Sequence, residues 1–254
     1  MKPLLLAALA LAVSPATSAQ AEGPSLKERF ETLDEAGDHA GVVALWKEHP
    51  YEVLYVIDSY LEGSLQIVET EESPDPAVLR SMHERALRGA RAADEAFDRG
   101  IFTDYAASFV GWNAAEQKNF RAGQAAFGAA RQAMGAGDHE AAAAHGAECA
   151  ALAEPLGDWW GLGMGLSAQG GSLAEAGNAA EALPLLARAR HIHHQLGLVG
   201  SEYGNLRSMI ELCAELGKTD RALVTLDAAL ALAETLGDGD GAAALRARRA
   251  QLSE

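Results

Sequence analysis

The apolar positions of this chain recur with the spacing of an α-helix, and no run alternates with a period of two. Residues 51–68 carry the broadest apolar face. Ala and Leu supply most of the apolar content, and both residues lose little free energy in a helix. The pattern therefore predicts an all-α protein. Outside the repeats described next, helices are expected over residues 25–36, in a segment ending at residue 49, and over residues 51–68, 77–98, 103–113 and 242–252.

Three segments within residues 119–238 align without gaps at a spacing of 40 residues. Each contains a glycine where a helix is expected to end, and glycine adopts the left-handed conformation of a helix terminus at little cost. The segments are therefore predicted to be three tandem helix–turn–helix units. The shared positions are Gly137, Gly177 and Gly217, then Ala142, Ala182 and Ala222, and finally Leu156-Gly157, Leu196-Gly197 and Leu236-Gly237.

The residues around each turn support the same register. Asp138 and Asn178 follow their glycines as candidate N-caps, and Asn178 with Glu181 is a candidate capping box. Small residues at matching positions would let paired helices approach closely, while Leu186 and Leu226 would fill the gaps between them. The small residues are Ala130 and Gly170 on the first helices, and Ala142, Ala182, Ala222, Cys149, Ala189 and Ala229 on the second helices.

In the second and third units, the turn glycine, an alanine, a large apolar residue and a small residue follow one another at fixed intervals. This pattern resembles the tetratricopeptide repeat family, in a unit longer than the usual length of about 34 residues. The matching residues are Gly177, Ala182, Leu186 and Ala189, and then Gly217, Ala222, Leu226 and Ala229. The first unit departs from the pattern because Gly146 replaces the large residue. The aromatic residue usual on the first helix is replaced by Ala133, Leu173 and Cys213.

The resemblance implies a right-handed α-solenoid of antiparallel helix pairs, whose first helices line a concave surface. Such a groove would suit an extended peptide with an apolar anchor near Phe127 and an acidic group near Arg131 or Arg207. The alternative is an ordinary solvent-exposed surface. From the register, the residues expected to face the groove are Gln124, Phe127, Arg131, Met134, Met164, Ser167, Arg207 and Glu211.

The remaining segments flank the repeats. Residues 22–72 are expected to form N-terminal helices with a degenerate repeat, because residues 36–39 have the same sequence as residues 136–139 and Trp46 supplies the large apolar residue. Residues 73–118 should form a long helix and a connector, after an acidic linker at residues 69–76. Residues 239–254 should form a capping helix with a polar outer face.

The first 21 residues have the layout of a secretory signal peptide. Lys2 precedes an apolar stretch of ten residues, and Ala19-Gln20-Ala21 matches a cleavage site. An uncleaved membrane anchor is the alternative, but a membrane span needs roughly 20 apolar residues. No later stretch is long and apolar enough, so the mature chain is expected to lack an integral membrane segment. We therefore expect an exported protein, either periplasmic or secreted.

Charge and cysteine content narrow the expected partners. The 20 basic and 36 acidic residues give a formal charge of −16, which disfavours nucleic acid and anionic lipid as partners. Cys149 and Cys213 lie a whole unit apart in the repeat register. Neighbouring helices pack roughly 8–10 Å apart, whereas a disulfide needs Cα atoms within about 7 Å. Two buried free thiols are therefore expected.

The histidines do not form a convincing metal site. His139 and His145 are six residues apart, whereas the zinc-protease motif needs two histidines four apart on one helical face. His191 and His194 share a face, but the segment offers no third ligand on it. We interpret His191, His193 and His194 as a solvated helix end, where cationic histidine interacts favourably with the helix dipole.

Two glycine-rich segments also lack a complete motif. Residues 161–165 resemble a phosphate loop, but such a loop follows a strand, so these glycines are predicted to pack helices together. Residues 237–241 have part of a calcium-loop pattern without the distal glutamate, and a flexible turn is expected there. No catalytic, metal-binding or cofactor-binding residue is predicted.

These observations favour a non-enzymatic scaffold or adaptor that binds a protein or peptide. The first alternative is a structural component of an envelope assembly. The second is a metal-dependent enzyme that uses the His191 and His194 segment.

Overall fold

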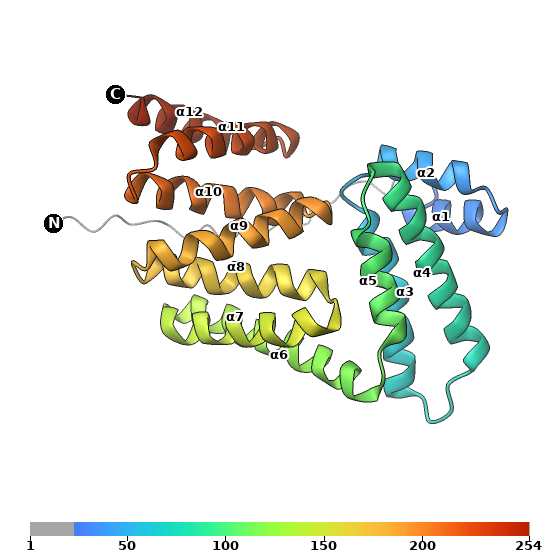
Figure 1. Ribbon diagram of the computed structural model, residues 1–254. Helices are drawn as coiled ribbons and strands as arrows, with labels where there is room; N and C mark the ends of the chain where they lie inside the picture. Colours follow the sequence, from blue (N-terminus) through green and yellow to red (C-terminus); the bar gives the residue numbers. More distant parts are fainter. Residues whose placement is uncertain (1–22, 254) are drawn as a thin grey trace.

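The computed structural model describes residues 23–253, and within this range every regular element is helical (Figure 1). Twelve α-helices and one short 3₁₀ turn cover most of these residues, and most consecutive helices pack against each other. The prediction of an all-α protein is therefore confirmed for this range. None of the described helices combines the length and apolarity needed to cross a membrane. The predicted signal peptide lies outside the described residues.

The first five helices form a group in which long and short helices alternate irregularly. They are α1 (Leu26–Glu35), α2 (His39–Glu48), α3 (Val53–Thr70), α4 (Pro76–Phe97) and α5 (Ile101–Gly111). The antiparallel helices α3 and α4 pack together, α5 lies beside them, and α2 packs against α4 (Figure 1). Large aromatic side chains fill this group. Phe30 and Trp46 have ring centroids 5.0 Å apart, and the indole N–H of Trp46 donates to the carbonyl of Gly89 at 3.0 Å.

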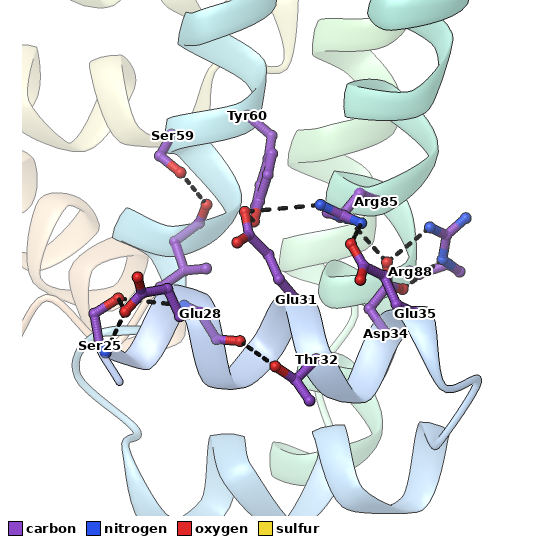
Figure 2. Close-up of polar contacts among 11 residues, drawn as sticks. Ser25, Glu28, Glu31, Thr32, Asp34, Glu35, Ser59, Tyr60, Arg85 and Arg88 are labelled. Atoms are coloured by element: carbon purple, nitrogen blue, oxygen red, sulfur yellow. Dashed lines mark hydrogen bonds and ion pairs between the residues drawn. The ribbon is translucent and has the colours of Figure 1, made fainter. Parts of the chain in front are cut away.

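Ion pairs attach α1 to α4 (Figure 2). Asp34 has a side chain that is only 4% exposed, and it accepts hydrogen bonds from Arg85 at 3.0 Å and from Arg88 at 2.6 Å. Burial alone would raise the pKa of Asp34, but the hydrogen bonds and charges of the two arginines outweigh it and lower that pKa. Arg85 also reaches Glu35, and Tyr60 of α3 donates to Glu31. This network fixes α1 across α3 and α4.

The remaining helices form a regular row in which each helix packs against the next (Figure 1). Contacts between α6 and α8, and between α8 and α10, also place the first helices of successive units side by side. The helices of the row are α6 (Ala114–Ala136), α7 (His139–Ala153), α8 (Trp159–Glu175), α9 (Ala179–Gln195), α10 (Val199–Glu215), α11 (Thr219–Thr235) and α12 (Gly239–Leu252). A 3₁₀ turn, Glu154–Leu156, follows α7.

Every turn in this row contains a left-handed glycine. Six glycines spaced 20 residues apart, from Gly137 to Gly237, have φ angles between 65° and 80°. The two 40-residue glycine series seen in the sequence therefore interleave, and each helix with its turn occupies 20 residues. Gly37 has the same conformation (φ 68°) between α1 and α2, at the site of the degenerate copy.

Small residues pack the helices of the row together, as the sequence predicts. The alanines five positions after each turn, Ala142, Ala182 and Ala222, are fully buried, and so is Leu226. Gly146 of α7 and Gly165 of α8 allow the closest approach. A Cβ on Gly165 would lie 2.6 Å from the backbone nitrogen of Ala150, and one on Gly146 would lie 2.5 Å from that of Gln169. The first unit therefore lacks the large residue because two helix backbones meet at Gly146.

Some local predictions need correction, and one is confirmed. Asn178 begins α9, but its side chain makes no capping hydrogen bond, so the predicted capping box with Glu181 is absent. A capping box occurs instead at Asn113 and Glu116, so α6 begins five residues before the first repeat boundary. Cys149 and Cys213 are both buried free thiols, as predicted.

The N-terminal helices and the helix row share one apolar core, which includes residues from Phe30 in α1 to Leu198 before α10. Polar contacts cross the same junction. The indole N–H of Trp112 donates to the carbonyl of Leu156 at 2.8 Å, and Arg99 donates to the carbonyl of Gln195 at 2.7 Å. The turns after α7 and α9 are therefore held against α5 and the end of α4.

Candidate functional site

A pocket of about 260 Å³ lies at this junction, between the N-terminal helices and α6, α7 and α8 at the start of the row. Residues from α3, α5, α6, α7 and α8, together with the turn before α8, line it. The lining residues are Asp58, Glu62, Tyr105, Phe120, Gly123, Gln124, Phe127, Cys149, Asp158, Trp160, Gly161 and Met164.

One part of the pocket is apolar. Phe120 is buried, while Phe127, Trp160 and Met164 remain partly exposed. Tyr55 of α3 packs edge-on against the Trp160 ring, with centroids 5.5 Å apart. Tyr55 belongs to the N-terminal helices and Trp160 to the helix row, so the contact between these two regions fixes the position of the Trp160 ring. These side chains offer an apolar surface to a ligand.

Another part of the pocket lining is acidic. The phenol of Tyr105 donates a hydrogen bond to Asp58 at 2.6 Å. Burial raises the pKa of Asp58 to about 7, against the lowering effect of that hydrogen bond, and the nearby Glu62 and Asp158 charges raise it further. At neutral pH this carboxyl is therefore close to its midpoint of titration.

Asp158 supplies the second carboxyl. It is the N-cap of α8 and accepts a hydrogen bond from the backbone N–H of Gly161 at 2.8 Å. Only 5% of its surface is exposed. Burial raises the pKa of Asp158 to about 6, although the hydrogen bond from Gly161 opposes the rise. Two carboxyls with raised pKa values therefore face the same pocket, an arrangement that is typical of functional sites.

The nearest cation is already paired. Arg121 donates to Glu62 at 2.8 Å and to Glu69 at 2.7 Å, and Gln124 also donates to Glu62. Glu62 therefore has an ion-pair partner, whereas Asp58 and Asp158 have none among residues 23–253. Cys149 donates weakly to the carbonyl of Gly161 at 3.5 Å. Burial raises the pKa of its thiol to about 11, which keeps it protonated and unreactive near neutral pH.

Three of the eight predicted groove residues, Gln124, Phe127 and Met164, line this pocket. Arg131 is exposed further along α6, and Met134 is 38% exposed near the end of that helix. The other three lie elsewhere on the first helices.

Those three residues have partners within the protein. Ser167 donates to Asn205 at 2.6 Å, and Glu211 pairs with Arg248 of α12 at 2.8 Å. The guanidinium of Arg207 lies 5.7 Å from the Tyr203 ring centroid. The structure therefore divides the predicted groove into a pocket near α6 and a more polar surface near α10.

Asp58, Tyr105, Asp158 and Trp160 were not identified from the sequence. One signal for Asp58 was present, because it lies four residues after Leu54 and three before Leu61, and both leucines are buried. A carboxyl on the apolar stripe of a helix is unusual and indicates a special environment. Nothing in the sequence connected Asp58 with Asp158, which is 100 positions away.

The histidine segment matches the expected solvated helix end only in part, because His191 and His194 are exposed as predicted whereas His193 is not. His193 is fully buried, and its Nδ1 lies 3.0 Å from the amide nitrogen of Asn205. Burial lowers the pKa of His193 to about 4, so this histidine is neutral and part of the core. His194 is exposed and lies 3.0 Å from Glu202 of α10, a neighbour that the sequence pattern did not reveal. Across residues 23–253, no three His, Cys, Asp or Glu side chains are grouped as a metal site would require.

The two glycine-rich segments have structural roles. Residues 161–165 lie inside α8, where Gly165 meets α7 and a Cβ on Gly163 would lie 2.8 Å from His193. Their predicted role in helix packing is confirmed. Residues 237–241 contain the turn at Gly237 and the first residues of α12, which Asp238 caps by accepting from the backbone N–H of Gly241.

Comparison with known proteins adds no family assignment. No protein-family model matches the chain, and no curated protein matches its sequence.

Proposed function

We propose that this chain is a non-enzymatic scaffold that binds a protein or peptide ligand along the exposed faces of α6, α8 and α10. In this proposal the helix row is a tetratricopeptide-like right-handed solenoid, and residues 1–21 direct export to the periplasm or beyond. The observation that carries the proposal is the pocket at the start of the row. Phe127 and Met164 contribute apolar surface from adjacent first helices, and Met134 extends that surface along α6.

The chemistry of the pocket supports binding over catalysis by a nucleophile. Cys149 is the only thiol among the lining residues, and its raised pKa disfavours the reactive thiolate. No lysine, arginine or histidine is present in the described lining that could activate a second group. A rigid helical scaffold with a partly apolar pocket suits a ligand side chain that serves as an anchor.

A display selection with a random peptide library tests this proposal directly. Peptides enriched on the purified chain are expected to bind the variant Phe127→Ala/Arg131→Glu at least about tenfold more weakly, the loss that corresponds to one anchor contact. Val224→Ser is the matched control. Val224 is 71% exposed, and it lies on α11, which is the second helix of the third repeat unit and does not line the proposed groove. Circular dichroism should confirm that all variants keep their helical content.

Two results would contradict the proposal. The first is that no peptide is enriched on the wild-type chain above a blank surface. The second is that enriched peptides bind the double variant and the wild type equally, which would place binding away from these first helices. A stable oligomer in solution without peptide binding would favour a structural component of a larger assembly.

A further inference from the structure

The pocket at the junction combines an apolar wall with two carboxyls, Asp58 and Asp158, that no cation neutralises within the described chain. We propose that it receives an aliphatic cation: an apolar stem that ends in an ammonium or guanidinium group. A lysine or arginine side chain of a bound peptide has this chemistry, and so does a small free alkylamine. The inference rests on the proposed binding function and specifies the group that the scaffold recognises.

The size of the pocket fits one such group. Its volume is about 260 Å³, whereas a single water requires only about 10–15 Å³ measured in this way. A lysine or arginine stem has about three or four methylene groups. The pocket therefore has room for one long side chain and its terminal charge, and it is too small for a whole helix or strand.

The charge of the lining selects a cation. Arg121 pairs directly with Glu62 and Glu69, and its charge only partly offsets that of Asp58, whose pKa stays raised. Removing a carboxylate from water without a partner is costly, and an oppositely charged group with good geometry offsets that cost. An anionic ligand would meet uncompensated repulsion here. A bound ammonium would instead supply N–H donors to carboxylate oxygens, which form strong hydrogen bonds with charged donors.

The aromatic wall is suited to the stem and to the charge. Phe127 and Trp160 present partly exposed rings to the pocket, and Met164 lies one helical turn after Trp160 on α8. Aliphatic stems pack well against such surfaces. A cation within about 6 Å of a tryptophan ring centroid also gains attraction from the ring quadrupole. The acidic and aromatic parts of the pocket therefore favour the same ligand.

Binding should release protons, which gives a second readout. The groups that face Asp58 are Tyr105, Glu62, Asp158 and Arg121, and those near Asp158 are Asp58, Glu62, Tyr105 and Cys149. Burial raises the pKa of Asp58 to about 7 and that of Asp158 to about 6. A cation stabilises the ionised carboxyls, so it must displace any proton they carry. Affinity should therefore be nearly constant above pH 8, fall by up to about tenfold per pH unit between pH 7 and pH 6, and fall more steeply below pH 6, where both carboxyls carry protons.

The experiment uses NMR titration of the purified full chain at pH 8 with defined probes. The peptide arm compares acetylated, amidated pentapeptides that have Lys, Arg or norleucine between glycines. The free-amine arm compares n-pentylamine with n-pentanol, and glucose serves as a neutral polyol. We expect each cation to bind at least about tenfold more tightly than its neutral counterpart, as for one charged hydrogen-bonded contact. Comparison of the two arms shows whether the pocket binds the cation as a peptide side chain or as a free small molecule.

Variants localise the binding. Asp58→Asn and Asp158→Asn should each weaken cation binding about tenfold or more. Asp220→Asn is the matched control, because it removes one negative charge from the exposed first turn of α11 and should leave binding unchanged. If a pocket variant loses its helical circular dichroism, the pH dependence of the wild type still tests the proposal.

Several results would overturn the inference. Norleucine or glucose binding as tightly as the cations would do so, and so would unchanged cation affinity in both pocket variants or between pH 8 and pH 5.5. If library-selected peptides bind the wild type and the pocket variants equally, the inference fails while the scaffold function stands. If neither cations nor selected peptides bind, both proposals fail.

Discussion

The N-terminal helices and the helix row fill the space between helices in different ways. In α1–α5, large side chains such as Phe30, Trp46 and Tyr105 are almost fully buried between helices that range from 10 to 22 residues in length. In the row, α8 to α11 all have 17 residues, and the buried positions nearest the neighbouring helix are often Ala or Gly. Irregular spacing requires large side chains, whereas close and regular spacing requires small ones.

The difference has a functional consequence at the place where the two regions meet. The N-terminal helices add Asp58, Glu62 and Tyr105 to the face of α6 and α8, and this addition forms the pocket. The helix row therefore contributes the aromatic wall and Asp158, and the N-terminal helices contribute Asp58, Glu62 and Tyr105.

The largest expected effect is the loss of a large side chain from the N-terminal helices. Trp46→Ala removes a fully buried indole and its hydrogen bond to Gly89, so the free energy of unfolding should fall by about 3–5 kcal/mol. Urea denaturation followed by circular dichroism measures the loss. Tyr51→Ala is the control, because Tyr51 is 43% exposed and should change stability little. Equal losses in the two variants would refute the importance of aromatic packing in this region.

The next largest effect is a difference in stability between alanine substitutions at two glycines of α8. Gly165→Ala should destabilise the protein by about 1–3 kcal/mol, because the new Cβ would lie 2.6 Å from the backbone of Ala150. Gly171→Ala should instead stabilise it by about 0.5–1 kcal/mol, since no atom lies within 4 Å and alanine favours the helix. Thermal unfolding of both variants should shift the melting temperature in opposite directions. Shifts of the same sign would contradict close backbone packing at Gly165.

The carboxyl at the junction should make stability depend on pH. The pKa of Asp58 is about 7 in the folded protein and about 3.9 when unfolded. Its contribution to stability is fully present below the unfolded pKa and is lost as the pH rises through 7. Asp58→Asn should therefore gain stability relative to wild type between pH 5 and pH 8. About two of the three units that separate these pKa values lie between pH 5 and pH 7, and each unit corresponds to about 1.4 kcal/mol; partial exposure reduces this sum, so we expect about 1–2 kcal/mol.

Denaturation of wild type, Asp58→Asn and Asp220→Asn at both pH values checks this prediction. The exposed control should retain the wild-type pH dependence. If Asp58→Asn has the same pH dependence as wild type, Asp58 does not have the raised pKa that the junction gives it.

The smallest effect compares two helix starts at equivalent positions of the row. Asp138 caps α7 by accepting from Ala141 at 3.0 Å, whereas the side chain of Asn178 makes no such bond at α9. Asp138→Ala should cost about 1 kcal/mol, and Asn178→Ala less than about 0.5 kcal/mol. Chemical denaturation of the two variants should separate them. A larger loss for Asn178→Ala would show that the capping roles are reversed.

The helix row could be predicted in detail because its interactions are local and repeat. A glycine at a helix end and an alanine at a fixed distance from it can be recognised within 40 residues. Gly177 has the left-handed conformation expected of such a glycine, and Ala182 is buried as expected of such an alanine. The burial of His193 could not be predicted, because it depends on Asn205 and the neighbouring α10. Side-chain rotamers also decided the absent cap at Asn178.

The candidate site was only partly predictable. Phe127 and Met164 follow from the helical register, so the sequence identified part of the apolar wall. Asp58 and Asp158 come from different regions, and no periodicity connects them. Their raised pKa values arise from burial at the junction, which exists only once α3 and α8 are packed together.

By itself, the sequence determined that residues 23–253 are helical, where most of their helices end, and which small residues pack the row, because helix propensity, helix capping and the conformation of a turn glycine are properties of short segments. Only the tertiary structure decided where the pocket lies and that two carboxyls face it without a cation. Solvation and the proximity of charges depend on groups that are distant in sequence but adjacent in space.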